Sequence, residues 1–245
     1  MCGIAGIITP NASNYRAELQ KMTDAIAHRG PDSAHQEFYE NAALGHRRLS
    51  IVDLSETGKQ PMFSQTKNEC IVLNGEIYGY LDLKKKYSNY HYRGTSDTEV
   101  ILAMYEQKGN ALLDELPGMF AFAIWNEEKQ ELFCARDRFG EKPFYYAHGK
   151  NGEFIFASEM KAILASGLIK PIVNQEAISH FLQYGYVSAQ QSIYSNIFTL
   201  PPAHFLVFSK GNIQVERYYS LPKNDVEISL SKAKEQFSHL LKNAV

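Results

Sequence analysis

The sequence has little cysteine and no long apolar run. Its 245 residues include three cysteines, Cys2, Cys70 and Cys134, which lie far apart and form no C-x-x-C pair. Sparse, separated cysteines argue against a disulfide framework or a zinc site and indicate a reducing compartment. The apolar run at the N-terminus ends at Thr9-Pro10 and follows no basic segment, so it is too short for a signal peptide or a membrane span. We therefore expect a cytoplasmic protein with no membrane partner.

An excess of charge of either sign is also missing. The formal net charge is −2, and 21% of the residues are charged, which gives no electrostatic reason to expect nucleic acid as a partner. The chain lacks a G-x-S-x-G elbow, a G-x-G-x-x-G loop, a Walker loop and an H-E-x-x-H helix. Its eight histidines show no metal-ligand spacing, so no metal site is predicted. What is present is 44% apolar residues, enough for a substantial globular core.

The apolar pattern predicts an α+β fold of two stacked antiparallel sheets covered by helices. Strands are expected at 3–8, 35–40, 42–52, 69–78, 119–126, 131–137, 143–148 and 153–159. Helices are expected at 17–28, 160–167 and 174–184, and a hairpin around 209–212. A further helix over Val100, Ile101 and Met104 is expected to open with a capping box formed by Ser96 and Glu99. Strands and helices come in runs, with no internal repeat within 1–220.

The last stretch differs from the rest. Pro222-Lys223-Asn224-Asp225 is typical of a linker, and a helix capped by Ser229 is expected to reach Val245. Its apolar face carries Leu230, Ala233, Phe237, Leu240 and Leu241. Such a face either packs on the main domain or starts a further domain. If it is exposed, it favours self-association, which leaves a homodimer open.

Cys2 is the leading candidate for a nucleophile. Removal of Met1 would leave a thiol and a free α-amine on one residue, a nucleophile with its own base attached. Asn74-Gly75 could supply an oxyanion hole, through an amide side chain and a backbone N–H next to it. The alternatives are an idle cysteine at a frayed end and an ordinary Asn-Gly hairpin turn.

A third set of residues suits a charged small molecule. Arg48, at the start of Arg48-Leu49-Ser50-Ile51-Val52, suits a carboxylate, and Glu76 and Asp97 suit an ammonium group. The alternatives are a charge at a strand edge for Arg48 and favourable first-turn helix electrostatics for Asp97.

Six sequence blocks occur together in one order. They are Cys2-Gly3-Ile4-Ala5-Gly6, His28-Arg29-Gly30-Pro31-Asp32, Arg48-Leu49-Ser50-Ile51-Val52-Asp53, Asn74-Gly75-Glu76-Ile77-Tyr78, Ser96-Asp97-Thr98-Glu99 and Asp137-Arg138-Phe139-Gly140-Glu141-Lys142-Pro143. Over 1–220 the chain resembles the class II glutamine amidotransferase domain, an N-terminal-nucleophile hydrolase. Within that family it is most similar to the glutaminase half of glutamine-hydrolysing asparagine synthetase. The resemblance implies a four-layer α/β/β/α sandwich.

The resemblance also implies residue roles. Cys2 would attack the side-chain amide of L-glutamine, and Asn74 and Gly75 would hold the oxyanion. Arg48 would bind the α-carboxylate, Glu76 and Asp97 the α-ammonium, and the backbone of Leu49, Ser50, Ile51 and Val52 would complete the pocket. No cofactor is implied for this step. ATP and Mg²⁺ are implied only for a C-terminal synthetase domain, whose S-G-G-L-D-S type loop this sequence does not contain.

Two blocks depart from the family pattern. Ser33-Ala34-His35 follows the second block where an acidic or glycine-rich continuation is common, and Ala203 stands where a glycine often follows Leu-Pro-Pro. We expect 1–220 to be the glutaminase domain and 221–245 to be a linker and the first helix of an absent synthetase domain. Two alternatives remain: ammonia delivery to another acceptor, such as a sugar acid, and a non-catalytic binding domain of the same fold.

Overall fold

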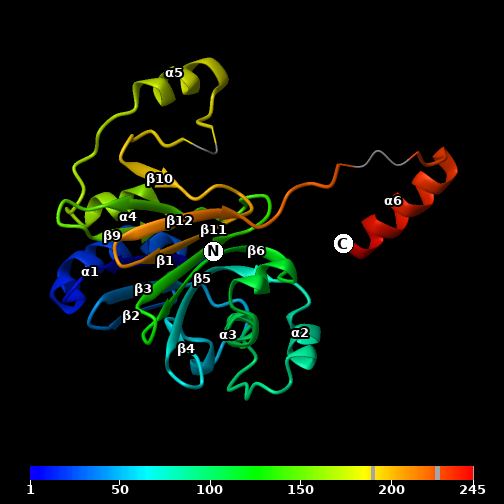
Figure 1. Cartoon of the computed structure of the whole chain (residues 1–245), viewed down its shortest axis with the longest axis horizontal. Helices are drawn as coiled ribbons and strands as arrows, with labels where there is room; N and C mark the ends of the chain where they lie inside the picture. Colours follow the sequence, from blue (N-terminus) through cyan, green and yellow to red (C-terminus); the bar gives the residue numbers. More distant parts are fainter. Residues whose placement is uncertain (189–190, 224–226, 245) are drawn as a thin grey trace.

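Two six-stranded antiparallel sheets stack face to face in the computed structural model, which describes residues 1–188, 191–223 and 227–244 (Figure 1). The strand order is β10-β8-β9-β1-β3-β2 in the first sheet and β12-β11-β7-β6-β5-β4 in the second. The strands are β1 (Gly3–Ile8), β2 (Ser33–Phe38), β3 (Ala42–Arg48), β4 (Met62–Phe63), β5 (Glu69–Ile77), β6 (Gly118–Asn126), β7 (Glu131–Arg136), β8 (Tyr145–His148), β9 (Phe154–Ala157), β10 (Ile197–Thr199), β11 (His204–Ser209) and β12 (Asn212–Arg217). The α-helices are α1 (Arg16–Ala25), α2 (Tyr80–Lys86), α3 (Thr98–Lys108), α4 (Met160–Ala165), α5 (Gln175–Tyr184) and α6 (Leu230–Ala244).

Helices cover the outer face of each sheet. Leu19 and Met22 of α1 and Ile163 of α4 pack in one apolar cluster with the first sheet. Val100 and Met104 of α3 pack in another cluster, against the second sheet. A third cluster fills the space between the sheets. The predicted α+β architecture of four α/β/β/α layers is therefore confirmed.

Side-chain alternation along the strands determines which residues face the space between the sheets. Ile4 and Ile8 of β1, Leu44 of β3 and Val72 of β5 lie in the inter-sheet cluster, whereas Leu73 packs on the α3 side. Successive side chains of a strand point to opposite faces, so residues two apart share a face. The even-numbered positions of β1, β3 and β5 therefore face the opposite sheet. The candidate residues discussed below include even-numbered positions at the ends of these strands.

Two sequence-based expectations about this region are wrong. The strand expected at 42–52 ends at Arg48, because its pairing with β2 ends at Ser33 and its pairing with β1 ends at Gly3. The capping box of Ser96 and Glu99 does not form. Ser96 Oγ accepts the N–H of Thr98, and the Glu99 carboxylate accepts backbone N–H groups of the preceding loop, at residues 93 and 94. The helix itself is present as α3.

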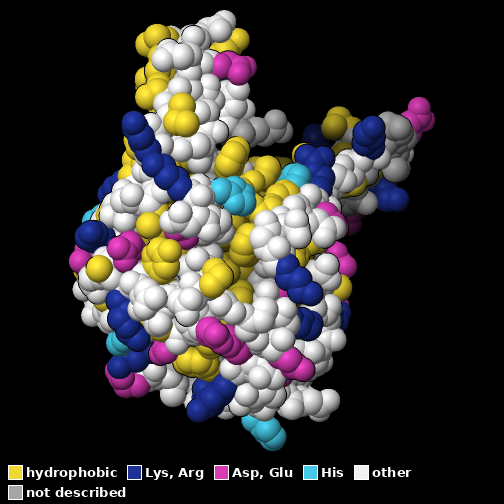
Figure 2. Space-filling model, turned by 60° about the vertical axis from the view of Figure 1, so that its left-hand side comes forward, with side chains coloured by type: hydrophobic (Ala, Val, Ile, Leu, Met, Phe, Trp, Pro, Cys, Tyr) yellow, Lys and Arg dark blue, Asp and Glu magenta, His cyan; other side chains and the backbone are white. Residues whose placement is uncertain are grey.

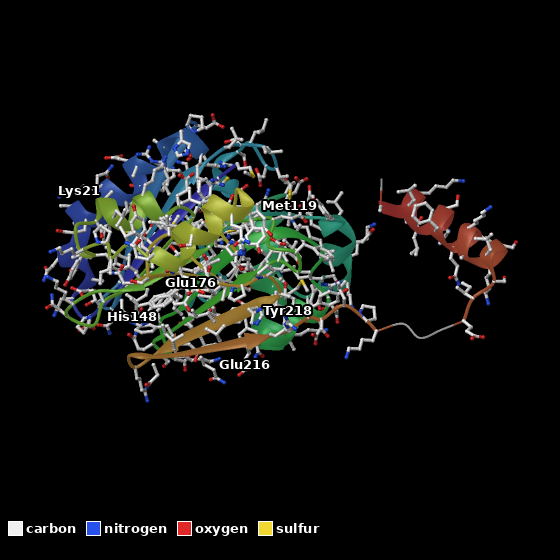
Figure 3. The ribbon with its side chains drawn as sticks, turned by 90° about the horizontal axis from the view of Figure 1, so that it is seen from above. Lys21, Met119, His148, Glu176, Glu216 and Tyr218 are labelled. Atoms are coloured by element: carbon white, nitrogen blue, oxygen red, sulfur yellow. The ribbon has the colours of Figure 1, made fainter. Side chains whose placement is uncertain are left out.

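The C-terminal helix was predicted in the right place. It runs from Leu230 to Ala244, and its apolar side chains Phe237, Leu240 and Leu241 are exposed. Figures 1 and 3 both show it apart from the sandwich. Of the expected linker, Asn224 and Asp225 lie outside the described residues, as does Val245 of the expected helix.

The molecular surface carries mixed charge. Figure 2 shows Lys and Arg side chains interspersed with Asp and Glu side chains on the face in view, in keeping with the net charge of −2. Among the helices that the structure describes, none is long and apolar enough to cross a membrane.

Candidate active site

Cys2 lies directly before β1, which has β9 on one side and β3 on the other. Its backbone is held in place, because Arg29 Nε donates to Cys2 O at 2.9 Å and Arg29 also pairs with Glu159 at 2.9 Å. The thiol Sγ lies 3.4 Å from the N–H nitrogen of Leu49 and 3.6 Å from its carbonyl oxygen. The terminus is therefore anchored rather than frayed, and Cys2 extends the inner-face row of β1.

Burial governs the titration of Cys2 and Asp97. It raises the pKa of the Cys2 thiol, although the Leu49 hydrogen bond and the positive charges of the N-terminus and Arg48 act in the opposite direction. It also raises the pKa of Asp97, against hydrogen bonds that include the one from Ile77 N–H. The thiol is therefore protonated at neutral pH and needs a base to become a nucleophile. A cation beside Asp97 would favour its charged form.

The edge of β5 next to the candidate site is open because β4 pairs with only two residues of β5. Farther along this edge, Leu73 N–H donates to Gln60 Oε1 at 2.6 Å and Ile77 N–H donates to Asp97 Oδ2 at 3.0 Å. Backbone N–H groups two residues apart in a strand point to the same edge. The N–H of Gly75, between these two, therefore also points to the open edge.

Asn74 continues the inner-face row of β5 beyond Val72. It is fully buried, and neither its Oδ1 nor its Nδ2 has a hydrogen-bond partner in the described part of the chain. Leaving a buried amide unpaired costs about 1–3 kcal/mol, so we expect a ligand to satisfy it. A Cβ on Gly75 would lie 2.4 Å from Met119 O across the ladder, which explains the glycine there. Both residues lie inside β5, so the interpretation of Asn74-Gly75 as a hairpin turn is wrong.

Three charged residues border the same space. Arg48 is buried at the end of β3, where its Nη1 donates to Ser55 O at 3.1 Å and its Nη2 donates to Asp53 O. It is thus not a solvent-facing charge at a strand edge. Within the described ranges, no ion pair joins Arg48, Glu76 or Asp97 to another side chain. One cation and two anions without an ion-pair partner among the described residues suit a zwitterionic ligand.

All the predicted site residues except Ser50 line one cavity of about 70 Å³. Those that line it are Cys2, Arg48, Leu49, Ile51, Val52, Asn74, Gly75, Glu76 and Asp97. Ser50 does not line it, because its backbone turns toward Asp32, whose Oδ2 accepts the Ser50 N–H at 2.7 Å. Residues from four separate stretches of the chain therefore meet at one end of the sandwich.

Sequence reasoning gave no role to several residues of this cavity, among them Lys142, Gln60 and Met119. Lys142 is 5% exposed, and its Nζ lies 2.9 Å from Met1 Sδ. It belongs to the block 137–143, so a signal was present without a role attached. Gln60 bridges Leu73 N–H and Thr98 Oγ1, at 2.6 and 3.1 Å. No local pattern marks Gln60, because both of its partners are distant in sequence. Met119, at the start of β6, also lines the cavity and is labelled in Figure 3.

Comparison with known proteins places this geometry in context. A family model described as a glutamine amidotransferase domain matches residues 1–219. A protein of Methanocaldococcus jannaschii named as a glutamine-hydrolysing asparagine synthetase is 40% identical over 267 residues, which cover 100% of this chain and 52% of the relative. Asparagine synthetase (glutamine-hydrolysing) 3 of Bacillus subtilis is 37% identical over 228 residues, which cover 90% of this chain and 37% of the relative. The chain thus spans about half the length of these relatives, or less.

A solved structure shares the fold. Glutamine phosphoribosylpyrophosphate amidotransferase of Bacillus subtilis matches with a TM-score of 0.66 at 19% identity, covering 89% of this chain and 49% of that one. At this identity the likeness concerns the fold alone. It agrees with the two-sheet sandwich described above.

Proposed function

The chain belongs to the glutamine amidotransferase domain family, and from this premise we propose that it hydrolyses L-glutamine to glutamate and ammonia. One observation carries the proposal: the anchored thiol of Cys2 lines the same cavity as the buried amide of Asn74, which has no hydrogen-bond partner among the described residues. A nucleophile and an oxyanion donor around one cavity are the groups that acyl transfer requires.

The proposed reaction starts with removal of Met1, which frees the α-amine of Cys2. Sγ attacks the side-chain amide carbon of glutamine as the amine takes the thiol proton. Asn74 Nδ2 and the N–H of Gly75 hold the oxyanion of the tetrahedral intermediate. The amine then returns the proton to the leaving nitrogen, the C–N bond breaks, and ammonia departs. Water hydrolyses the remaining thioester and releases glutamate.

The proposed recognition of glutamine uses the charges around the cavity. Arg48 binds the α-carboxylate, while Glu76 and Asp97 bind the α-ammonium. The backbone of Leu49, Ile51 and Val52 completes the pocket. This assignment is supported by the lack of internal ion-pair partners for these three side chains among the described residues. It also accounts for the buried position of Asp97. Burial raises the pKa of the Asp97 carboxyl, and the bound α-ammonium would favour its charged form.

The proposed use of the ammonia follows the relatives, which are named as asparagine synthetases and are longer than this chain. Residues 1–220 would form the glutaminase domain, and 221–245 would lead into a synthetase domain. That domain would bind ATP and Mg²⁺ and convert aspartate to asparagine in the cytoplasm. No cofactor is proposed for the glutaminase step itself. The alternative acceptor is a sugar acid, and the remaining alternative is a non-catalytic domain.

The test combines mass spectrometry with an ATP-free glutaminase assay. We expect the purified protein to lack Met1 and to release ammonia from glutamine, and we expect Cys2→Ala to abolish the release. The matched control is Cys134→Ala, which removes a thiol that is buried between the sheets and lies outside the cavity. This control should stay folded and active. Substantial ammonia release by Cys2→Ala would show that the nucleophile is assigned wrongly, and a folded but inactive wild type would favour the non-catalytic alternative.

A further inference from the structure

The loop that follows β3 is organised around a single carboxylate. Between Arg48 and Gln60 the chain contains only one turn of 3-10 helix, at Glu56–Gly58. Within this loop Asp53 adopts a left-handed backbone conformation, with φ of 53°. Such a φ is uncommon outside glycine, and asparagine and aspartate tolerate it best. In this conformation Asp53 uses both its carbonyl oxygen and its carboxylate as acceptors.

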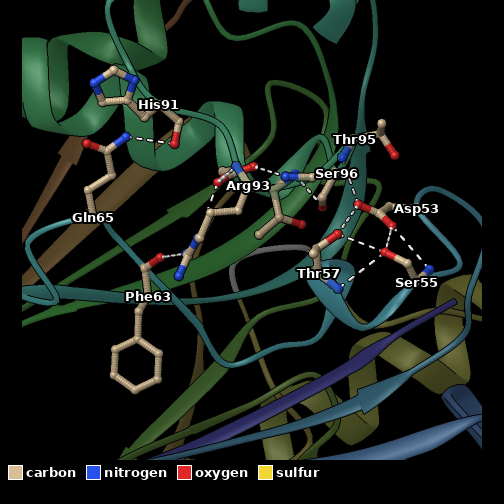
Figure 4. A network of polar contacts seen from close by, with 12 residues as sticks. Asp53, Ser55, Thr57, Phe63, Gln65, His91, Arg93, Thr95 and Ser96 are labelled. Carbon is tan, nitrogen blue, oxygen red and sulfur yellow. Dashed lines mark hydrogen bonds and ion pairs between the residues drawn. The ribbon is translucent and has the colours of Figure 1, made fainter.

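The Asp53 carboxylate binds donors from two segments of the chain (Figure 4). Within its own loop, Oδ1 accepts the N–H of Ser55 at 3.1 Å and the Ser55 hydroxyl, and Oδ2 accepts the Thr57 hydroxyl at 3.0 Å. Across to the segment before α3, Oδ2 accepts the N–H of Thr95 at 2.8 Å. The last contact spans 42 positions of sequence, so this carboxylate fastens two loops together.

The two loops approach too closely for a side chain between them. A Cβ on Gly94 would lie 2.3 Å from Thr57 Oγ1 and 2.5 Å from Asp53 Oδ2. On the other side of the Gly94 segment, the carboxylate of Glu99 accepts the N–H of Arg93 at 2.8 Å and that of Gly94 at 3.1 Å. Three successive N–H groups, at 93, 94 and 95, are therefore held by two carboxylates, one from each side.

Each loop carries one end of the proposed glutamine site. The carbonyl oxygens of Asp53 and Ser55 accept from the Arg48 guanidinium, so the first loop sets the direction of that side chain. A Cβ on Gly58 would lie 2.4 Å from Arg48 Nη2, which shows how closely the loop wraps the guanidinium. The second loop leads within two residues to Asp97. The hydrogen bond from Thr95 N–H to Asp53 is therefore a direct link between the segment that holds Arg48 and the segment that carries Asp97.

We propose that Asp53 is a positioning residue that fixes the spacing between Arg48 and Asp97, and so sets the affinity for the zwitterionic end of the substrate. The inference rests on the proposed glutaminase function. Asp53 touches no reacting atom. Its carboxylate locks the Arg48 loop to the segment that carries Asp97, so the pocket is preformed before the amino acid enters.

The carboxylate stays ionised throughout the working pH range. Partial burial opposes ionisation, but the hydrogen bonds from Ser55, Thr95 and Thr57 outweigh it and hold the pKa of Asp53 well below its ordinary value. The lock is therefore expected to act equally at pH 6 and pH 8. Hydrogen bonds to a charged acceptor are also stronger than those between neutral groups.

The test compares Asp53→Asn with Glu56→Gln. Asparagine tolerates the left-handed backbone and keeps the side-chain shape, but it turns one acceptor atom into a donor. Glu56→Gln removes the same charge three positions away, where the exposed carboxylate pairs with Lys59 at the surface. For Asp53→Asn we expect KM for glutamine to rise about tenfold, the effect of about 1.4 kcal/mol of lost binding, with kcat within about threefold of wild type. Glu56→Gln should leave both constants unchanged.

Two further measurements separate positioning from a general structural role. With 4-aminobutanamide, a glutamine analogue that lacks the α-carboxylate, Asp53→Asn should change kcat/KM less than twofold, because Arg48 no longer contributes. In a Cys2→Ala background, the Kd for glutamine measured by calorimetry should rise about tenfold on adding Asp53→Asn. This binding measurement does not require turnover, so it tests the lock even if the proposed hydrolysis fails.

Several outcomes would overturn the proposal. An unchanged KM and Kd would show that Asp53 does not position the site. A fall in kcat with KM unchanged, or equal losses for glutamine and the analogue, would show a structural role only. A tenfold rise in KM and in Kd, confined to the substrate that carries the carboxylate, supports it. If Asp53→Asn fails to fold, Thr95→Pro, which removes the N–H donor to Oδ2 and leaves the Asp53 carboxylate in place, must give the same pattern for the proposal to stand.

Discussion

Replacing Asn74 by leucine is expected to stabilise the protein while it disables catalysis. Leucine has a similar shape and removes both polar atoms. The structure gives Asn74 no hydrogen bond to lose, since neither side-chain atom has a partner within 1–188, 191–223 and 227–244. A buried amide left unpaired costs about 1–3 kcal/mol, so the free energy of unfolding should rise by about that amount. For a chain of this length each kcal/mol raises Tm by roughly 2–4 °C.

The glutaminase activity of Asn74→Leu, in contrast, should fall. Loss of one oxyanion donor typically lowers kcat by about 10²–10³, with KM little changed because the donor acts mainly in the transition state. The assays are urea and thermal unfolding, followed by ATP-free glutaminase kinetics on the same preparations. Gln60→Met is the matched control, because it also removes a buried amide but breaks its bonds to Leu73 N–H and Thr98 Oγ1. This control should lose about 1–3 kcal/mol of stability.

The comparison of the two variants decides the question. If Asn74→Leu is destabilised as much as Gln60→Met, the Asn74 amide has structural partners and the reasoning is refuted. Full kcat in a stabilised Asn74→Leu would refute the oxyanion assignment alone.

Three other outcomes are expected. Asp97→Asn should lower kcat/KM for glutamine by about tenfold or more, since a charge-assisted contact contributes about 1.5–3 kcal/mol; an unchanged value in steady-state assays would remove Asp97 from the pocket. Burial lowers the pKa of His46 in the folded protein to about 4. Between pH 6.5 and 4 the imidazole is therefore protonated in the unfolded chain but neutral in the folded one. As the pH falls through this range, the free energy of unfolding should drop by up to about 3 kcal/mol from its value above pH 6.5. In urea unfolding, the difference in free energy between pH 7.5 and pH 5 should be smaller for His46→Gln than for the wild type. An equal difference in the two proteins would show that His46 is not the group responsible. Deleting 226–245 should change Tm by less than about 2 °C and weaken any self-association seen by light scattering, because the apolar side chains of α6 are exposed; a drop of many degrees would place α6 in the core.

Local pattern predicted most of the elements. The bounds of β6 and β7 were predicted to within one residue from the apolar runs of the sequence. This succeeded because the side-chain periodicity of a strand depends on neighbours only two positions away. Periodicity also placed α1 and α5. The helix α2 at Tyr80–Lys86 was not anticipated, since its apolar face is short and none of its residues is buried.

The sequence was ambiguous where a short motif has two structural meanings. Asn74-Gly75 is a common turn dipeptide, yet here it continues a strand, because β6 pairs with both residues. Ser96 and Glu99 have the spacing of a capping box, yet the Glu99 carboxylate binds the loop before the helix. In both cases the outcome depends on which backbone lies alongside, and the motif itself carries no such information.

The sequence alone determined the chemistry that is available and the family, through a cysteine at the second position and the ordered blocks. Tertiary structure decided which polar groups have partners. It gave the Asn74 amide no partner within the described ranges, and it paired the N–H groups of Leu73 and Ile77. It also turned Ser50 toward Asp32 and tied Asp53 to Thr95. The physical reason is that a hydrogen bond depends on which groups meet in space, and here the partners are mostly a dozen or more positions apart in sequence.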